Sequence, residues 1–181
     1  MSLRSIVKFT LIFAAAFVLS YYAAYWVMLD KHPGFVEERG VSLRLVNVLD
    51  KEQFDDAHID GGAQVQSIQS SLQDLPNQAA EWDKSVPVVT YCSNYYCLAS
   101  SSAAEKLMDL GFKEVYAYEA GMAEWFQLSQ QDKEYRVAGP AQAKYLNIKV
   151  KKSSKKHENI RLISSQQLKE LIKKANLKKE E

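Results

Sequence analysis

The apolar residues of this chain fall into short runs that alternate with polar or amphipathic stretches. Residues 43–49 form one such run, and residues 86–91 form a second, nearly continuous and β-branched run. This pattern is typical of strands that are covered on both faces in a parallel sheet. Val115 and Ala117 alternate in a further short strand.

Helical patterns separate these strands. A polar helix is predicted at residues 51–57, a short helix at 77–83, and a third at 121–128 that carries Trp125. Ala103, Leu107 and Leu110 recur at helical spacing, with serines 100–102 available as caps before them and Gly111 as a stop after them. Because strands alternate with helices, the sequence predicts an α/β fold with a parallel sheet flanked by helices.

The last part of the chain repeats the alternation less regularly. Residues 143–151 predict a strand, and residues 160–175 predict a strand followed by an amphipathic helix with Leu168, Leu171 and Ile172 on one face.

The strongest apolar segment lies near the N-terminus. Residues 9–29 contain no charged residue, which suits one transmembrane helix across a hydrocarbon core of about 30 Å. Arg4 and Lys8 precede it and favour a cytoplasmic N-terminus, with the domain facing the periplasm or the cell exterior. The alternative is a cleaved signal peptide, which would leave the domain secreted or periplasmic.

Charge is distributed unevenly. Residues 1–137 carry 11 Lys and Arg against 18 Asp and Glu, whereas residues 138–181 carry 12 against 4. The basic tail has no interleaved aromatics or binding motif, so we expect a solvated face that can dock on the acidic body, and no nucleic-acid binding. Two cysteines and three histidines without ligand spacing predict neither a metal site nor a cofactor.

Both cysteines lie in one loop, and the first of them is the best candidate for chemistry. Cys92 stands where the strand at 86–91 gives way to the next helix. Backbone N–H groups of a tight loop and the positive end of that helix would favour its thiolate.

Three segments in this order resemble the rhodanese homology domain, a family of sulfurtransferases with a parallel α/β sheet. They are VNVLDKEQFDDAHIDGGAQV, the loop and helix that begin at YC, and GFKEVYAYEAGMAEW, and together they lie within residues 43–128. The resemblance implies that Cys92 is the nucleophile and carries sulfane sulfur as a persulfide. Loop amides would then bind the anionic sulfur; the substrate-binding candidates are Ser93, Asn94, Tyr95, Tyr96 and Leu98.

The sequence departs from the family at several positions. Asn47 stands where Asp is usual, Leu49 where Arg is usual, and Ala57 where Gly is usual, and the loop has Cys97 where the family often has Arg. Without a loop cation the case for a dianionic donor such as thiosulfate weakens. A Cys-x4-Cys loop followed by a serine, here Ser100, nevertheless resembles a variant among bacterial members.

Three roles for the cysteine pair stay open at this point. Cys92 can act as a sulfur-carrying nucleophile with Cys97 as a resolving thiol, the two can form a thiol-disulfide redox pair, or the domain can be a catalytically silent binding module. We expect the short spacing within a tight loop to disfavour a structural disulfide.

Other side chains near the motifs have simpler interpretations. His58 is expected to tie a turn, whereas Tyr95 and Tyr96 either line a donor pocket or cover the loop. Partners implied by the resemblance are a sulfane-sulfur donor and a small thiol or protein thiol acceptor.

The predicted organisation has four parts. The parts are a membrane anchor or signal at residues 1–30, a linker at 31–42, a rhodanese-like domain at 43–130 and a basic extension at 131–181.

We also expect the C-terminal strand and helix to return to the edge of the sheet, because the linker is too short to supply the edge strand and helix that usually precede the first central strand in the family.

Overall fold

The computed structural model describes residues 40–149 and 159–177. They belong to a compact unit that spans Gly40–Glu181. The predicted membrane segment at residues 9–29 lies outside the described residues. Within the described ranges, no helix combines the length and the apolar character needed to cross a bilayer.

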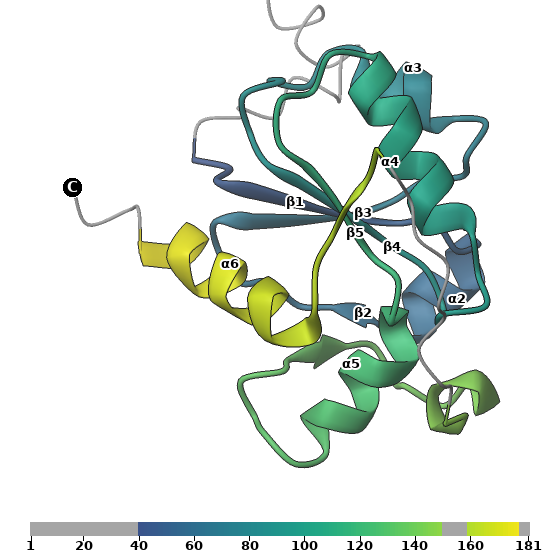
Figure 1. Ribbon diagram of the computed structural model, residues 1–181. Helices are drawn as coiled ribbons and strands as arrows, with labels where there is room; N and C mark the ends of the chain where they lie inside the picture. The colour runs from purple at the N-terminus through teal and green to yellow at the C-terminus, as the bar shows by residue number, and fades with distance from the viewer. Residues whose placement is uncertain (1–39, 150–158, 178–181) are drawn as a thin grey trace, which may run out of the picture. The chain divides into compact units, whose positions relative to one another are not determined.

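A five-stranded parallel sheet forms the centre of the unit, with the strand order β3-β1-β4-β5-β7 (Figure 1). The α/β fold with a parallel sheet is therefore confirmed. The strands are β1 (Leu43–Asn47), β3 (Val65–Gln69), β4 (Val88–Tyr91), β5 (Val115–Tyr118) and β7 (Arg161–Leu162).

Helices lie on both faces of this sheet, and a small antiparallel sheet of two strands lies beside it. In Figure 1, α3 and α4 lie on one side of the sheet, with α5 and α6 on the other. The helices are α2 (Lys51–Asp56), α3 (Leu75–Ala79), α4 (Ala99–Asp109), α5 (Gly121–Ser129) and α6 (Ser165–Leu177), with a 3-10 helix η1 (Lys144–Asn147); the small sheet pairs β2 (His58–Ile59) with β6 (Val137–Ala138).

The alternation of side chains along each strand divides the core into two clusters. On β4, Val89 and Tyr91 join a cluster with Trp125 of α5 and Leu168 of α6. Val88 and Cys92 join the opposite cluster; its other members include Leu75 and Ala79 of α3 and Ala103, Ala104 and Leu107 of α4. Because successive residues of a strand point to opposite faces, the side chain of Cys92 lies on the α4 face.

The C-terminal segment packs on the sheet. β7 pairs with β5 at one edge, in register at Tyr116–Arg161, and α6 packs against β1 and β3. The expected return of the chain to the sheet edge is therefore present. Part of the basic tail also docks on the acidic body, since Lys169 Nζ lies 3.0 Å from carboxylates of Asp132 and Glu134.

One strand was not predicted and two local predictions were wrong. Residues 65–69, for which no strand was predicted, form the edge strand β3, which is only half-buried and so lacks an apolar pattern. The strand predicted from residue 143 is instead the 3-10 helix η1, which buries Leu146 alone. The serines at 100–102 lie inside α4 rather than capping it; Ser101 Oγ instead donates to Glu119 Oε1 at 2.9 Å.

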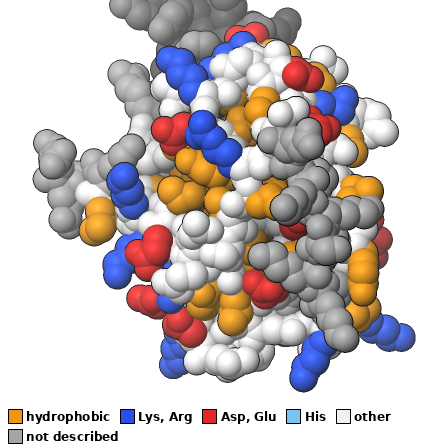
Figure 2. Space-filling view, viewed as in Figure 1, with side chains coloured by type: hydrophobic (Ala, Val, Ile, Leu, Met, Phe, Trp, Pro, Cys, Tyr) orange, Lys and Arg blue, Asp and Glu red, His pale blue; other side chains and the backbone are white. Residues whose placement is uncertain are grey.

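The surface of the unit is mixed. In the view of Figure 2, hydrophobic side chains gather in the middle of the face and charged side chains of both signs surround them. Large hydrophobic residues that are exposed elsewhere than in the cysteine loop include Met108, Ile148, Leu162 and Leu177.

Candidate active site

The cysteine loop, which we define as residues 92–98, joins the carboxyl end of β4 to the start of α4. Cys92 directly follows the fully buried strand β4, and only 1% of its surface is exposed. Thr90 Oγ1 donates to the carbonyl of Ser100 at 2.7 Å, which ties the start of α4 to the strand. The loop therefore begins and ends on rigid elements.

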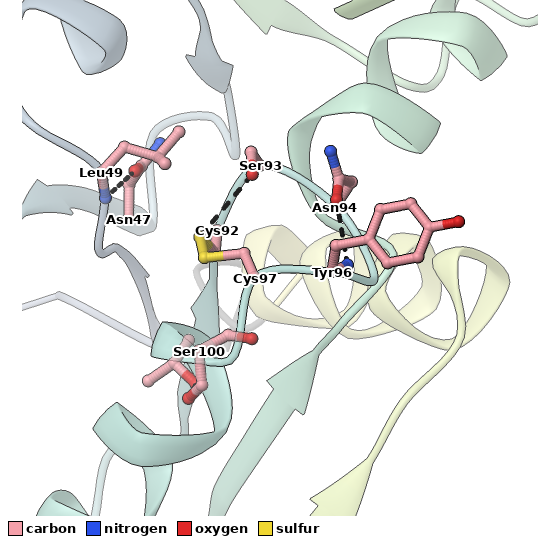
Figure 3. Close-up of a disulfide and its surroundings, with 9 residues drawn as sticks. Asn47, Leu49, Cys92, Ser93, Asn94, Tyr96, Cys97 and Ser100 are labelled. Carbon is pink, nitrogen blue, oxygen red and sulfur yellow. Dashed lines mark hydrogen bonds between the residues drawn. A yellow bond between two sulfur atoms is a disulfide. The ribbon is translucent and has the colours of Figure 1, made fainter. Parts of the chain in front are cut away.

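A disulfide joins Cys92 and Cys97 (Figure 3). The expectation that their spacing disfavours such a bridge was wrong. The amide of Cys97 donates to the carbonyl of Asn94 at 3.0 Å, and this turn brings the two Cα atoms within 6.2 Å. That separation lies inside the range of about 4.4–6.8 Å that disulfides use.

Loop amides meet partners within the loop. The amide of Tyr96 donates to Asn94 Oδ1 at 3.0 Å, and the amide of Cys97 is bound to Asn94 as described above. In the disulfide form these two groups face the turn and not the sulfur of Cys92. The hydrogen-bond contact at Cys92 Sγ is instead with Ser93 Oγ, at 3.9 Å.

The first residues of α5 hold the other side of the loop. The amides of Met122 and Ala123 donate to the carbonyls of Cys92 and Ser93 at 2.8 and 2.9 Å. Gly121, with φ +64°, permits this close approach, because a Cβ there would lie 2.5 Å from the carbonyl oxygen of Cys92. The glycine before Trp125 therefore has a direct role in shaping the cysteine loop.

Exposure divides the candidate substrate-binding residues. Tyr96 is 75% exposed and Leu98 is 48% exposed. Within the described residues, neither side chain lines a buried pocket, and both present apolar surface in the loop that contains the disulfide. Tyr95 is half-buried and donates to Glu124 Oε2 at 3.3 Å. Asn94 and Tyr95 also line a cavity of about 230 Å³; the other lining residues are Ala120, Ala123, Glu124, Gln127, Ile148 and Lys149.

The cavity wall carries one acidic residue, Glu124, and one basic residue, Lys149. Burial, followed by the negative charge of Glu124, raises the pKa of Tyr95 to about 12. The same two causes raise the pKa of Tyr118, which is buried on β5. Since Tyr95 and Tyr118 pack with the α5 face of the sheet and Cys92 with the α4 face, the cavity and the thiol lie on different sides of the loop.

A second serine lies near the disulfide. Ser100, in the first turn of α4, appears among the side chains around the bridge in Figure 3. Its Oγ is buried and, among the residues that the structure describes, has no hydrogen-bond partner. This hydroxyl and that of Ser93 are therefore available as donors in the neighbourhood of the thiol pair.

The positions where the first motif departs from the family have structural roles. Asn47 Oδ1 accepts the amide of Leu49 at 2.8 Å and shapes the end of β1, and Leu49 is buried in the apolar cluster that includes Cys92. His58 stacks on Phe54, with ring centroids 4.1 Å apart, and one ring nitrogen lies 2.9 Å from the carbonyl of Phe54. His58 therefore ties its turn.

Sequence reasoning missed Glu119 and Glu124. Glu119 accepts from Ser101, and Glu124 accepts from Tyr95. Glu119 directly follows β5, whose carboxyl end lies beside that of β4 because the two strands are parallel, whereas Glu124 lies in the first turn of α5. The position of Glu119 after a buried strand was a usable signal. Within residues 40–149 and 159–177, no three His, Cys, Asp or Glu side chains are grouped as a metal site.

Comparison with known proteins places this architecture in a family. Residues 35–128 match the family model described as "Rhodanese-like domain". The chain is 31% identical over 81 residues to "Thiosulfate sulfurtransferase GlpE" of Coxiella burnetii, covering 45% of this chain and 69% of that protein. The protein of the same name from Shewanella oneidensis is 28% identical over 86 residues, covering 48% and 78%.

Solved structures give similar matches. The rhodanese-like domain of Alr3790 from Anabaena sp. has 23% identity and a TM-score of 0.41, covering 48% of this chain and 92% of that one. A structure described as "rhodanese with anions from E. coli" has 23% identity and a TM-score of 0.35, covering 44% and 86%. On the family match, which spans β1 through most of α5, this chain belongs to the rhodanese-like domain family.

Proposed function

We propose that this protein is a sulfurtransferase that carries sulfane sulfur as a persulfide on Cys92, with Cys97 as a resolving thiol. The observation that carries the proposal is the placement of Cys92, the family's nucleophile position, at the end of β4 and within bonding reach of Cys97. The two relatives named thiosulfate sulfurtransferases support the class of reaction.

The first step is loading of the reduced protein. The Cys92 thiolate attacks the outer sulfur of a donor, a Cys92 persulfide forms, and the donor leaves with the bonding electron pair, for example as sulfite from thiosulfate. The hydroxyls of Ser93 and Ser100 are the neutral donors available to the anionic sulfur.

The second step removes the sulfur by one of two routes. An external thiolate can take the outer sulfur and restore the Cys92 thiolate. Alternatively, the Cys97 thiolate attacks Sγ of the Cys92 persulfide, expels hydrosulfide and leaves the Cys92–Cys97 disulfide that the structure contains. In the first route the outer sulfur is transferred as sulfane sulfur and the bonding electron pair stays on Cys92 Sγ. In the second route hydrosulfide leaves with the bonding pair, and the two cysteine sulfur atoms form the disulfide. Neither route requires a further oxidant.

Charge around the loop favours particular donors. The segment between Lys84 and Lys106 contains no Lys or Arg, and Glu119 and Glu124 lie next to the loop. A dianionic donor would find no cation within that segment to bind it. We therefore expect polysulfides or low-molecular-weight persulfides to load Cys92 faster than thiosulfate does.

Intact mass measurement on the reduced full chain tests the proposal. The chain and its Cys92→Ser and Cys97→Ser variants are exposed to inorganic polysulfide or to thiosulfate, and thiol state is measured in parallel. We expect one added sulfur in the parent chain and a longer-lived adduct in Cys97→Ser, which lacks the resolving thiol. Cys92→Ser is the matched control and should gain none.

Failure of this test has a defined meaning. An adduct that forms equally well in Cys92→Ser would contradict the assignment of the nucleophile. Formation of the internal disulfide without any sulfur adduct would favour a second function, thiol-disulfide exchange through the pair, which the disulfide in the structure also supports. Unreactive thiols in every variant would leave a binding module.

We also propose that residues 9–29 hold the domain at a membrane, with the domain outside the cytoplasm. The uncharged segment and the preceding Arg4 and Lys8 support this, as does a disulfide, since such bonds persist in oxidising compartments. Retention of the chain in the membrane fraction after alkaline carbonate, with the domain open to external protease, is expected. A mature N-terminus beyond residue 20 would indicate cleavage instead.

A further inference from the structure

We propose that reduction of the Cys92–Cys97 disulfide has a fixed direction: the incoming thiol attaches to Cys97, and Cys92 leaves as the thiolate. The inference deepens the proposed function, because it names the residue that accepts the reductant when Cys92 is regenerated. The exchange itself requires only the disulfide, so it can be tested without any sulfur donor.

Access to the two sulfur atoms differs. Cys92 is 1% exposed and packs in the apolar cluster of the α4 face with residues such as Val46 and Ala103. Cys97 is only partly buried and stands between Tyr96 and Leu98, which are both exposed. Cys97 packs against the same cluster, but of the two cysteines it is the more exposed to solvent.

The geometry of exchange makes this difference decisive. A thiolate attacks one sulfur of a disulfide from the side opposite the sulfur that leaves, so the attacked sulfur must be open along that line. An attack on Cys92 would have to approach through the packed core between β4 and α4. An attack on Cys97 approaches from the surface of the loop.

One contact assists Cys92 as the leaving group. Ser93 Oγ lies 3.9 Å from Cys92 Sγ, within the distance for a hydroxyl to donate to a thiolate sulfur. Apolar burial disfavours a thiolate, and a hydroxyl donor offsets part of that penalty, so the contact with Ser93 speeds the departure of Cys92. The carbonyls of Cys92 and Ser93 are held by α5, so this pair keeps its position while the bridge opens.

The balanced step needs a thiol of defined class. A low-molecular-weight thiolate or one thiol of a protein dithiol bonds to Cys97 Sγ, and the electron pair of the broken bond goes to Cys92 Sγ. A second thiol then displaces the adduct from Cys97, and the reductant is oxidised to its own disulfide. Cys92 is in the form that can accept sulfur from the first of these steps onward.

Peptide mapping on the oxidised full chain tests the direction. The chain is treated briefly with glutathione as the probe thiol and quenched into excess N-ethylmaleimide at several early times. Trypsin leaves both cysteines in the peptide of residues 85–106, and fragmentation assigns each modification to one cysteine. We expect glutathione on Cys97 and N-ethylmaleimide on Cys92 in at least tenfold excess over the reverse pattern, when extrapolated to zero time.

Two outcomes overturn the proposal: equal amounts of both patterns, or glutathione mainly on Cys92. A variant tests the role of the leaving group separately. Ser93→Ala should slow the opening of the bridge about three- to tenfold, the value of one hydrogen bond, without changing the pattern of modification. An unchanged rate would remove Ser93 from the step. Since no sulfur donor is present, failure of sulfur transfer leaves this map unaffected.

Discussion

The cysteine loop and the C-terminal clasp are held in opposite ways. We define the clasp as α6 together with residues 61–64, which it holds. In the cysteine loop, backbone groups of Met122 and Ala123 and one disulfide maintain the shape, while Tyr96 and Leu98 stay exposed. In the clasp, buried apolar side chains of α6 and the side chain of Asn176 make the contacts.

The two regions should therefore respond differently to opening of the disulfide and to loss of apolar packing. Asn176 donates to the carbonyl of Gly61 at 2.7 Å and accepts the amide of Gln64 at 3.1 Å, so the clasp binds the segment before β3 to the last helix. In the cysteine loop only Cys92 is fully buried, and the other side chains are half-buried or exposed. Covalent change at the loop should therefore leave the sheet intact, whereas loss of apolar contact in the clasp should destabilise the whole unit.

Gly121→Ala should have the largest effect, because it acts on the backbone contact that fixes the cysteine loop. The added Cβ would meet Cys92 O at 2.5 Å, Ser93 C at 2.7 Å and Asn94 N at 2.8 Å, all of them backbone atoms, at a residue with φ +64°. Strain and overpacking together should cost about 4 kcal/mol of unfolding free energy. Urea denaturation measures the loss, and the rate of sulfur loading at Cys92 should fall with it.

Gly111→Ala is the matched control. Gly111 also has a positive φ, +87°, but a Cβ there would meet only the side chain of Lys84, at 4.0 Å. We expect a cost of about 1 kcal/mol from the conformation alone. Equal losses of unfolding free energy in the two variants would show that the clash with the cysteine loop adds nothing to the cost of Gly121→Ala.

Leu168→Ala tests the clasp by removing its most buried side chain. Leu168 is fully buried on α6 in the cluster with Trp125 and Tyr135. The cavity should lower the free energy of unfolding by about 3 kcal/mol, measured by urea denaturation. Direction of exchange at the disulfide should stay the same. The control, Leu177→Ala, alters a side chain that is 59% exposed and should change stability by less than about 0.5 kcal/mol.

Reduction of the disulfide is the next test, and it acts on the cysteine loop alone. The bridge lowers the conformational entropy of the unfolded chain, and for so short a loop this contributes about 2 kcal/mol to the free energy of unfolding. The reduced protein should therefore be less stable by that amount. Far-ultraviolet circular dichroism should not change, because the sheet and both core clusters persist without the bridge. Loss of the β signal on reduction would contradict the separation of loop and clasp.

Much of this comparison was visible in the sequence. The near-continuous apolar pattern of residues 86–91 predicted β4, and the helical spacing of Ala103 and Leu107 predicted α4, which together place Cys92. Leu168, Leu171 and Ile172 predicted the apolar face of α6. These elements could be predicted because each buries a full face or stripe, and burial leaves a periodic pattern.

The parts that sequence reasoning missed depend on contacts between distant segments. β3 is an edge strand with little burial, so its sequence lacks the alternation of a central strand. The disulfide depends on a turn closed by Asn94, which a rule based on spacing did not include. Glu124 gained significance only when α5 placed it beside Tyr95.

The smallest predicted effect concerns the side-chain hydrogen bond from Tyr95 to Glu124, which ties the cysteine loop to α5. Burial and the carboxylate of Glu124 raise the pKa of Tyr95 to about 12, above its model-peptide value of about 10. Glu124→Gln removes the charge that disfavours tyrosinate, so the pKa of Tyr95 should fall by a fraction of a unit and stay above about 10 because burial persists. Alkaline titration of tyrosinate absorbance measures it, with Tyr95→Phe identifying the signal.

The same hydrogen bond links the loop to the stability of the fold at high pH. The pKa of Tyr95 is higher in the folded than in the unfolded state, so its stabilising contribution is complete below about pH 10 and is lost as pH rises through about 12. Glu124→Gln should make this loss smaller and complete it at lower pH. Glu119→Gln is the control. The charge of Glu119 also raises the pKa of Tyr95, but less than that of Glu124, so this variant should shift the pKa of Tyr95 less. Equal shifts in the two variants would mean that the loop is not tied to α5 by the Tyr95–Glu124 contact, and that backbone bonds and the disulfide alone define it.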